Sequence, residues 1–572
     1  MLLRIILASV LSVFAAMSDN TAKYRKVMKD VFLSNEISAP TSQRLSAASI
    51  AAGAAGVADY ARAGASGGCS SNTHRDLLKS MMRDCDYPAF YWADIPVWDA
   101  KLQATIIVSM PFLLPHECLD ALAKNGKLGN AVSTQENCPP GVWQHLKKLE
   151  SILHCKVHDM IALGLHGDGA PTGANASLEQ LSWSLPAWQG DGYGPRFVAC
   201  TILKEFVQTH ETFNAIFEVL AWSFKCSATK CWPAARHDGS PWQESDKWRS
   251  QQSGELAARG CLCHARGDWK FFKETFNFPA WNAKESMCWL CKANKHNMKD
   301  ASLSAPWRQQ RRTPGHLLHD LRQQGVRPCP LFSVPGFDET CVLVDWLHTM
   351  DIGVTADVLG IFFYELSKLL PGATKKLRAE CLWTKVQAWY TRHPGALKIP
   401  PLTAEMVKGK DKKPKMRGLK ASQIKSLVPC AAALAEEFCK GSPRLDTIRC
   451  AVLHLDSLYK CLHENQWPKE AAAAAARKLM LLYAALEQEQ LVVGNTTFWS
   501  MKPKFHLMLE LVEYVAPAQG NPRFYWTYAD EDFGGWLAKL SARRGGPKNP
   551  DSVALKVLKL ATALEKLRDL DM

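Results

Sequence analysis

The chain has 572 residues, of which 47% are hydrophobic and 22% are charged, and its formal net charge is +14 at pH 7. This composition can bury a large core and excludes wholesale disorder, and the length indicates several units or one core with large insertions. The excess of 69 Lys and Arg over 55 Asp and Glu favours a polyanionic partner, most simply nucleic acid.

The first 87 residues predict a low-complexity leader. Residues 1–17 (MLLRIILASVLSVFAAM) have the early Arg, apolar stretch and small residues of a secretory signal, although a misplaced start or a buried helix would also explain them. This stretch is short for a membrane span, so we expect no membrane association of the mature form. Residues 18–71 are rich in Ala, Ser and Gly and predict a flexible segment.

Residues 88–225 predict the first part of a folded core. Three β-rich runs between Val157 and Lys204, joined by turns, predict a β-meander that opens a mixed sheet. Residues from Thr209 to Phe224 predict a helix. Residues 226–330 are rich in Cys and Trp and predict a loop-like insertion.

The rest of the chain alternates core segments with helices. Residues 331–372 predict a short buried strand (ETCVLVDWLH) and an apolar helix from about Val354 to Leu370. Residues 373–495 predict a helical insertion, interrupted by a basic loop from Lys408 to Lys420. Residues 496–572 predict C-terminal core helices.

Three acids stand where metal-binding carboxylates are expected. Asp168 ends an apolar strand before Gly169, and Asp345 ends the buried run CVLV. Glu531 lies at a predicted helix start, where Asp530 and Asp532 are rival candidates and a dipole interaction is the alternative role. Asp351 is a rival to Asp345, or a helix cap.

The motifs around these acids resemble those of a known family. HGDGAPTG, SLEQLSWSLPAW, VDWLHTMDIGVTADVLG and KPKFHLMLELVEY…YWTYADEDFGGWLAKL together resemble DDE transposases of the CACTA (En/Spm-like) type. That family shows an Asp-Gly after the first strand, an Asp-x-x-His pair before an apolar helix, and a Lys-Pro-x-x-His helix before a final glutamate. The resemblance spans roughly residues 159–544, with long unmatched stretches.

The resemblance implies an α/β fold, a ribonuclease-H-like mixed sheet core with a Cys-rich insertion and a large all-helical insertion. It implies that Asp168, Asp345 and Glu531 hold two Mg²⁺ ions, that His348 and His506 support the site, and that DNA is cut and joined. No recognisable DNA-binding domain precedes Asp168, and its spacing to Asp345 is long. A truncated or domesticated copy, acting as a catalytically inactive nucleic-acid or protein-binding module, is therefore the alternative.

Nineteen cysteines at irregular spacings indicate reduced thiols and a candidate metal site rather than a disulfide framework. Two close pairs, Cys261 with Cys263 and Cys288 with Cys291, match the ligand types of a structural Zn²⁺ site, against the alternative of buried thiols. Substitute ligands are Cys226, Cys231, His264 and His296.

Basic residues give candidate DNA contacts. These are Lys410, Lys412, Lys413, Lys415 and Arg417 in the basic loop, Arg543 and Arg544 beside the last acid, and Arg308, Arg311 and Arg312. The alternatives for the basic loop are a nuclear localisation signal or a solvated loop with no binding role. We expect DNA as partner, a homo-oligomer and a nuclear location. The second alternative is a secreted protein, given the signal-like start and the sequons at Asn175 and Asn495.

Overall fold

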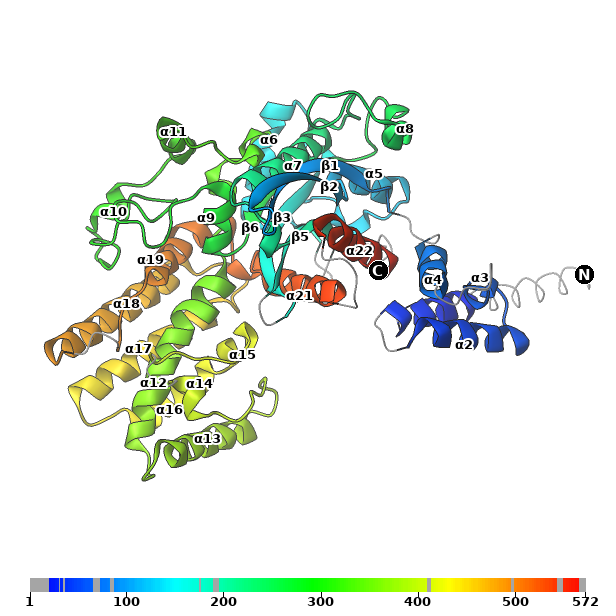
Figure 1. Cartoon of the computed structure of the whole chain (residues 1–572). Helices are drawn as coiled ribbons and strands as arrows, with labels where there is room; N and C mark the ends of the chain where they lie inside the picture. Colours follow the sequence, from blue (N-terminus) through cyan, green and yellow to red (C-terminus); the bar gives the residue numbers. More distant parts are fainter. Residues whose placement is uncertain are drawn as a thin grey trace, which may run out of the picture.

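The structure is a computed structural model of the chain (Figure 1), and it is of mixed α/β type. It describes residues 20–29, 31–33, 37–64, 72–82, 87–173, 176–188, 195–408, 413–494, 498–542 and 549–564. Several predictions fall outside the described residues, namely those for residues 1–17, Asn175, Lys410, Lys412, Asn495, Arg543 and Arg544.

The N-terminal region contains helices where a flexible leader was expected. They are α2 (Ala39–Ala51), α3 (Ala58–Ala61) and α4 (Thr73–Met82). The Ser38 side chain accepts a hydrogen bond from the backbone N–H of Thr41 and caps α2. Alanine is the best helix former, so the Ala-rich composition that reads as low complexity also suits helices. Tyr60 and Leu77 are buried.

Two sheets form the β part of the molecule. β1 (Tyr91–Asp99) and β2 (Ala104–Phe112) make an antiparallel hairpin. The second sheet has the order β5-β4-β3-β6, with strands β3 (Met160–Pro171), β4 (Ser177–Ser184), β5 (Arg196–Leu203) and β6 (Arg259–Arg266). The first three are successive antiparallel neighbours, which confirms the predicted meander, whereas β6 runs parallel to β3.

Two predictions about strands were wrong. β6 lies in the segment predicted to be loop-like, because its sequence RGCLCHAR has no obvious β pattern although residues 260–266 are all buried. The segment ETCVLVDWLH forms no full strand. Its residue Val342 makes a single parallel bridge to Ala265 of β6. A π-helical segment follows at Leu347–Thr355.

Helices cover both faces of the second sheet. Successive side chains of a strand point to opposite faces, so Leu163 and Leu262 face α7 (Glu211–Thr229) while Ala162 and Cys261 face α6 (Pro140–Leu153). The C-terminal helix α21 (Tyr528–Ala542) packs against β3 and β4, and α22 (Pro550–Leu564) packs against β5 and β2. This places the first turn of α21 near the end of β3.

Residues 373–495 contain helices as predicted, and these helices, which we call the helical insertion, extend away from the sheet (Figure 1). The predicted apolar helix is α12 (Ala356–Leu369). It is followed by α13 (Lys375–Arg392), α14 (Ala404–Val407), α15 (Ala421–Ser426), α16 (Val428–Phe438), α17 (Pro443–Cys461) and α18 (Lys469–Val492). The chain then returns to the sheet through α19 (Pro503–Glu510) and α20 (Ala516–Gln519).

Shorter helices lie before the insertion. They are α5 (Pro115–Lys124), α8 (Lys247–Ser250), α9 (Trp269–Phe276), α10 (Pro306–Gln309) and α11 (His316–Gln323). Among the described residues, no helix is both long enough and apolar enough to cross a bilayer. No disulfide joins the described cysteines.

Candidate functional site

Asp168, His348 and Glu531 converge at the end of β3, and we call them the carboxylate–histidine cluster. One ligand atom from each residue lies within 4.8 Å of the other two. Asp168 belongs to β3, His348 to the π-helical segment and Glu531 to the first turn of α21. Asp168 and Glu531 are half-buried, so the cluster remains open to solvent. Three of the residues singled out in the sequence are thus brought together.

A close contact between α21 and the sheet brings Glu531 to Asp168. Gln180 of β4 lies opposite Asp168 in the strand register. Its side chain reaches Gly534 of α21, where an added Cβ would lie 2.5 Å from Gln180 Nε2. The glycine therefore lets the helix approach the strands closely, one turn after Glu531.

Asp345 lies behind His348 rather than in the cluster. Asp345 Oδ2 accepts hydrogen bonds from the backbone N–H of His348 at 2.8 Å and from its Nδ1 at 2.9 Å. Asp345 Oδ1 accepts from the backbone N–H of Thr527 at 3.0 Å. The carboxylate thus orients the imidazole and fixes the tautomer, as carboxylates do behind metal-binding histidines. The structure therefore places Asp345 where it orients His348, and its predicted role as a direct ligand stays a prediction.

The electrostatics of His348 follow from this pairing. Burial lowers the pKa of His348, but the hydrogen bond and charge of Asp345 offset it and raise the pKa to about 9. His348 Nε2 lies 3.5 Å from Glu531 Oε1, on the side of the ring away from Asp345. This nitrogen is therefore the one that faces the cluster.

The structure separates the three neighbouring acids of α21. Asp530 is buried and bound by Arg196 at 2.8 Å and Arg266 at 2.9 Å, and although burial opposes it these guanidinium groups hold its pKa well below the usual range. Asp532 is exposed. Only Glu531 of the three reaches Asp168.

Glu531 lies between the carboxylate of Asp168 and the imidazole of His348. Its Oε1 atom is buried but accepts no hydrogen bond from any described residue. Burial and the nearby charge of Asp168 raise the pKa of the Glu531 carboxyl. Two carboxylates this close are destabilised when both are ionised, and a cation between them removes that cost.

Asp351, the rival to Asp345, is fully engaged elsewhere. It accepts hydrogen bonds from the hydroxyls of Tyr459 at 2.5 Å and Tyr528 at 2.6 Å. Burial raises its pKa to about 7. Asp351 therefore holds the π-helical segment in the core and is not in the cluster.

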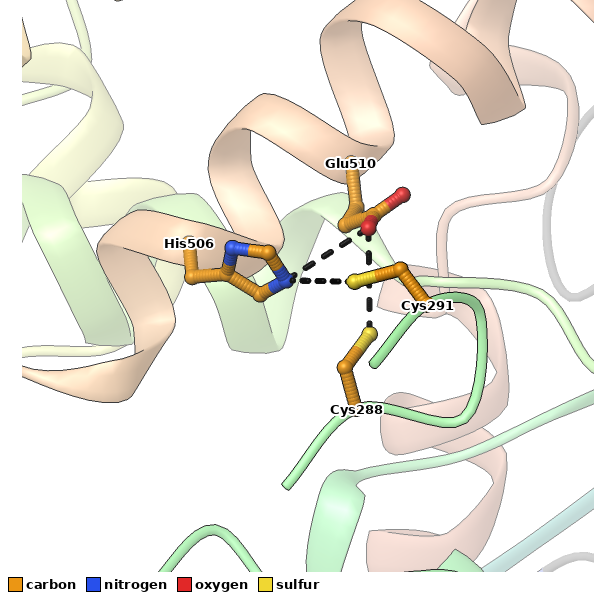
Figure 2. Close-up of side chains that lie close together, drawn as sticks. All are labelled: Cys288, Cys291, His506 and Glu510. Atoms are coloured by element: carbon orange, nitrogen blue, oxygen red, sulfur yellow. Dashed lines mark hydrogen bonds and ion pairs between the residues drawn. The ribbon is translucent and has the colours of Figure 1, made fainter. Parts of the chain in front are cut away.

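His506 lies in a second group, with Cys288, Cys291 and Glu510, which we call the cysteine–histidine–glutamate cluster (Figure 2). His506 thus lies in a different group from Asp168 and Glu531, and its predicted supporting role stays a prediction. Cys261 and Cys263 are also absent from this group, because they lie on β6 and pack toward α6 in a separate apolar cluster. The predicted pairing of the two cysteine pairs is corrected accordingly.

None of the substitute zinc ligands considered from the sequence belongs to this group either. Cys226 and His264 are buried, whereas Cys231 and His296 are exposed. Glu510 was missed by sequence reasoning. The signal was its spacing of four residues from His506, which places both side chains on one helix face.

The described residues of the basic loop differ in exposure. Lys413 is exposed, whereas Lys415 lies 4.0 Å from Asp357 and Arg417 donates to the backbone carbonyls of Lys413 and Lys415. Lys415 therefore contacts α12, Arg417 holds the loop backbone together, and Lys413 is the residue open to a ligand.

The arginines of the Cys-rich insertion have protein partners. Arg308 is bound to Glu513, Arg311 to Glu510 and Arg312 to Asp320. All three guanidinium groups therefore take part in internal ion pairs, and their role in neutralising phosphates stays a prediction.

A scan against protein-family models finds no match to this chain, and a search of curated protein sequences finds no significant relative.

Proposed function

We propose that the carboxylate–histidine cluster binds divalent cations and that the protein cuts and joins DNA strands as a DDE-type enzyme with a ribonuclease-H-like core. The observation that carries this proposal is the convergence of Asp168, His348 and Glu531 from three distant segments. All three stand in the motifs that carry the family resemblance. Their order along the chain and their meeting in space are independent observations.

The donor set fits a divalent metal. Two carboxylates suit Mg²⁺ or Mn²⁺, and an imidazole also admits first-row transition ions. The buried Glu531 Oε1 without a hydrogen bond is the acceptor that such an ion would satisfy. When bound, the cations would activate the attacking oxygen and stabilise the leaving oxygen at phosphorus.

The sheet supports the fold assigned to the core. A meander of three antiparallel strands is followed by a strand parallel to the first, on its other side. Such a mixed sheet is the arrangement expected of a ribonuclease-H-like core. Asp168 lies on its central strand β3 and Asp345 follows the bridge beyond β6.

The proposed reaction needs no cofactor other than the metal. In cutting, a water oxygen bonds to phosphorus, the bond from phosphorus to the 3′-oxygen breaks, and a 3′-hydroxyl leaves. In joining, that 3′-hydroxyl attacks a second phosphodiester and displaces its 3′-oxygen. Asp345 keeps His348 oriented throughout, and Lys504 Nζ holds the His348 carbonyl at 2.7 Å.

A basic cavity on the helical insertion supports a DNA partner. It has a volume of about 1590 Å³. Its basic lining residues are Lys368, Lys375, Lys376, Arg378, Lys408 and Lys413. Phosphate contacts with such side chains release counterions, which is the main source of DNA affinity.

The test is cleavage of supercoiled plasmid DNA with Mg²⁺ or Mn²⁺. We expect metal-dependent nicking by the wild type and by Asp532→Asn, whose side chain is exposed, and no nicking by Asp168→Ala. Equal nicking by the wild type and Asp168→Ala would overturn the proposal. A wild type that binds Mn²⁺ and plasmid DNA but leaves the DNA intact would also overturn it.

A further inference from the structure

We propose that Cys288, Cys291, His506 and Glu510 form a tetrahedral Zn²⁺ site that fastens the Cys- and Trp-rich insertion to α19. Figure 2 shows the four side chains pointing toward one another, two from a loop of the insertion and two from α19. The site is separate from the carboxylate–histidine cluster and does not depend on the activity proposed for it.

The distances between the ligand atoms match a zinc tetrahedron. Cys291 Sγ lies 3.3 Å from His506 Nε2, His506 Nε2 lies 3.4 Å from Glu510 Oε1, and Cys288 Sγ lies 3.9 Å from the same oxygen. Zn–S bonds of about 2.3 Å and Zn–N or Zn–O bonds of about 2.1 Å give tetrahedral edges of roughly 3.6 Å to sulfur and 3.4 Å between nitrogen and oxygen. The side chains are therefore already spaced as ligands of one ion.

The charges of the cluster also suit a divalent cation. All four residues are fully buried, and buried charges must be balanced by partners. With zinc bound, both cysteines are thiolates, and together with one carboxylate they carry three negative charges. Zn²⁺ supplies two positive charges, and Arg311, whose guanidinium lies 2.5 Å from Glu510 Oε2, supplies the third. The metal-bound site is neutral as a whole.

The loop that carries the cysteines is organised as a ligand loop. The backbone N–H of Leu290 donates to Cys288 Sγ at 3.3 Å, a bond that favours the thiolate. Cys291 makes an isolated antiparallel bridge to Arg311, so the backbone of the charge-balancing arginine lies beside the cysteine loop. Trp307 packs edge-on against the His506 ring, with the centroids 4.7 Å apart.

Four protein ligands and full burial indicate a structural site, since catalytic zinc keeps an open position. The site would clamp the insertion to α19. The same helix carries Lys504, whose Nζ binds the His348 carbonyl at 2.7 Å. The clamp therefore supports the helix that contacts the carboxylate–histidine cluster from behind.

The proposal is tested by metal analysis of the full-length chain produced with zinc, and by absorption after replacement with Co²⁺. We expect about one zinc ion per chain and the thiolate-to-cobalt charge-transfer band of a tetrahedral site with sulfur ligands. The band distinguishes this site from the carboxylate–histidine cluster, which has no thiol. Asp168→Ala should keep both the zinc and the band.

The matched variants compare buried thiols inside and outside the cluster. Cys288→Ser with Cys291→Ser should lose the zinc and the band, whereas Cys261→Ala with Cys263→Ala should keep them. A wild type that takes up neither zinc nor cobalt would overturn the proposal, and this result does not depend on whether any variant folds. Zinc retained at full stoichiometry by the folded Cys288→Ser, Cys291→Ser protein would overturn it as well.

Discussion

The two clusters differ in openness although each is built around one histidine. In the carboxylate–histidine cluster the side chains of His348 and Glu531 are 11% and 33% exposed, whereas those of His506 and Glu510 are 0% exposed. The first offers three ligands and the second offers four. A site with vacant coordination positions can take a substrate, and a closed site can only hold structure. The difference is what we expect if the first cluster is the proposed reactive site and the second is the proposed structural zinc site.

The pKa values of the two histidines are nevertheless shifted in the same direction by the same kinds of interaction. Burial lowers the pKa of both, and negative partners offset it, so that each pKa is raised to about 9. For His348 the main partner is Asp345, and for His506 the partners are Cys288 and Glu510. In both clusters a metal must therefore displace a proton from the imidazole, which couples metal binding to pH.

The largest effect is expected from removing a proposed metal ligand of the carboxylate–histidine cluster. Asp168→Ala should lower metal-dependent DNA cleavage by roughly 10⁴-fold or more, the loss found when a member of a catalytic unit is deleted. Cleavage rates on plasmid DNA measure it. The zinc content should stay unchanged, because Asp168 does not belong to the cysteine–histidine–glutamate cluster. A parallel loss of zinc would mean that the two clusters are not independent.

A large loss of stability is expected from Arg266→Met. Asp530 is buried and would keep only Arg196 as its charged partner. Breaking a buried ion pair costs about 3 to 5 kcal/mol in the free energy of unfolding. Urea unfolding measures this, with Arg327→Met as the control, because the ion pair of Arg327 with Glu218 is exposed and should contribute little. An unfolding free energy within about 1 kcal/mol of wild type would show that Asp530 does not need Arg266.

A smaller effect is expected from Asp345→Asn. Loss of an oriented carboxylate behind a metal-binding histidine typically lowers metal affinity by about 10- to 100-fold. The pKa of His348 should fall below its present value of about 9, which an NMR titration measures. The pair stabilises the fold fully below the unfolded pKa of about 6.5, and this stabilisation is lost as the pH rises through about 9. The variant should therefore approach the wild type in stability above that pH, and a constant difference would contradict the assignment.

Mn²⁺ binding to the carboxylate–histidine cluster should depend on pH. His348 and Glu531 both have raised pKa values in the metal-free protein. Affinity should therefore increase with pH up to about 9, by about tenfold per pH unit for each proton released. Calorimetric titrations in buffers of different ionisation enthalpy count the protons. Affinity that is flat between pH 6 and pH 8 would show that neither group binds the ion.

The smallest effect is expected from Lys413→Ala. This exposed lysine lines the basic cavity of the helical insertion. Its loss should weaken DNA binding uniformly across sequences and reduce the slope of log K against log salt by about 1. Lys415→Ala is the contrasting variant, because Lys415 lies near Asp357 and should affect loop stability more than the salt slope. Identical salt slopes for the wild type and Lys413→Ala would remove Lys413 from the DNA interface.

The sequence predicted what depends on local pattern. The meander followed from β-rich runs separated by turns. Asp168 and Glu531, which lie close together in the structure, were singled out from a predicted strand end and a predicted helix start, although β3 continues beyond Asp168 to Pro171. β6 was missed because Cys, His and Arg replace the usual apolar residues of a buried strand. Its burial depends on α6 and on neighbours far along the chain, which no local pattern reveals.

The finer assignments depend on long-range contacts. Adjacent residues at a helix start point in different directions, and only the positions of Arg196 and Arg266 decide that Asp530 turns inward. Asp345 lies behind His348, and its Oδ1 atom accepts a hydrogen bond from the backbone N–H of Thr527, a residue far along the chain. Likewise, the contact of His506 with Cys291 was not predicted, because the loop that carries Cys291 comes from a distant segment of the chain.

The most direct test of the central claim is calorimetric titration of Mn²⁺ into the zinc-loaded protein at pH 8, comparing the wild type with Glu531→Gln and Asp532→Asn. We predict saturable Mn²⁺ binding by the wild type and Asp532→Asn, and binding at least about tenfold weaker by Glu531→Gln. Equal Mn²⁺ affinity of the wild type and Glu531→Gln would contradict the claim that Asp168, His348 and Glu531 form one metal centre.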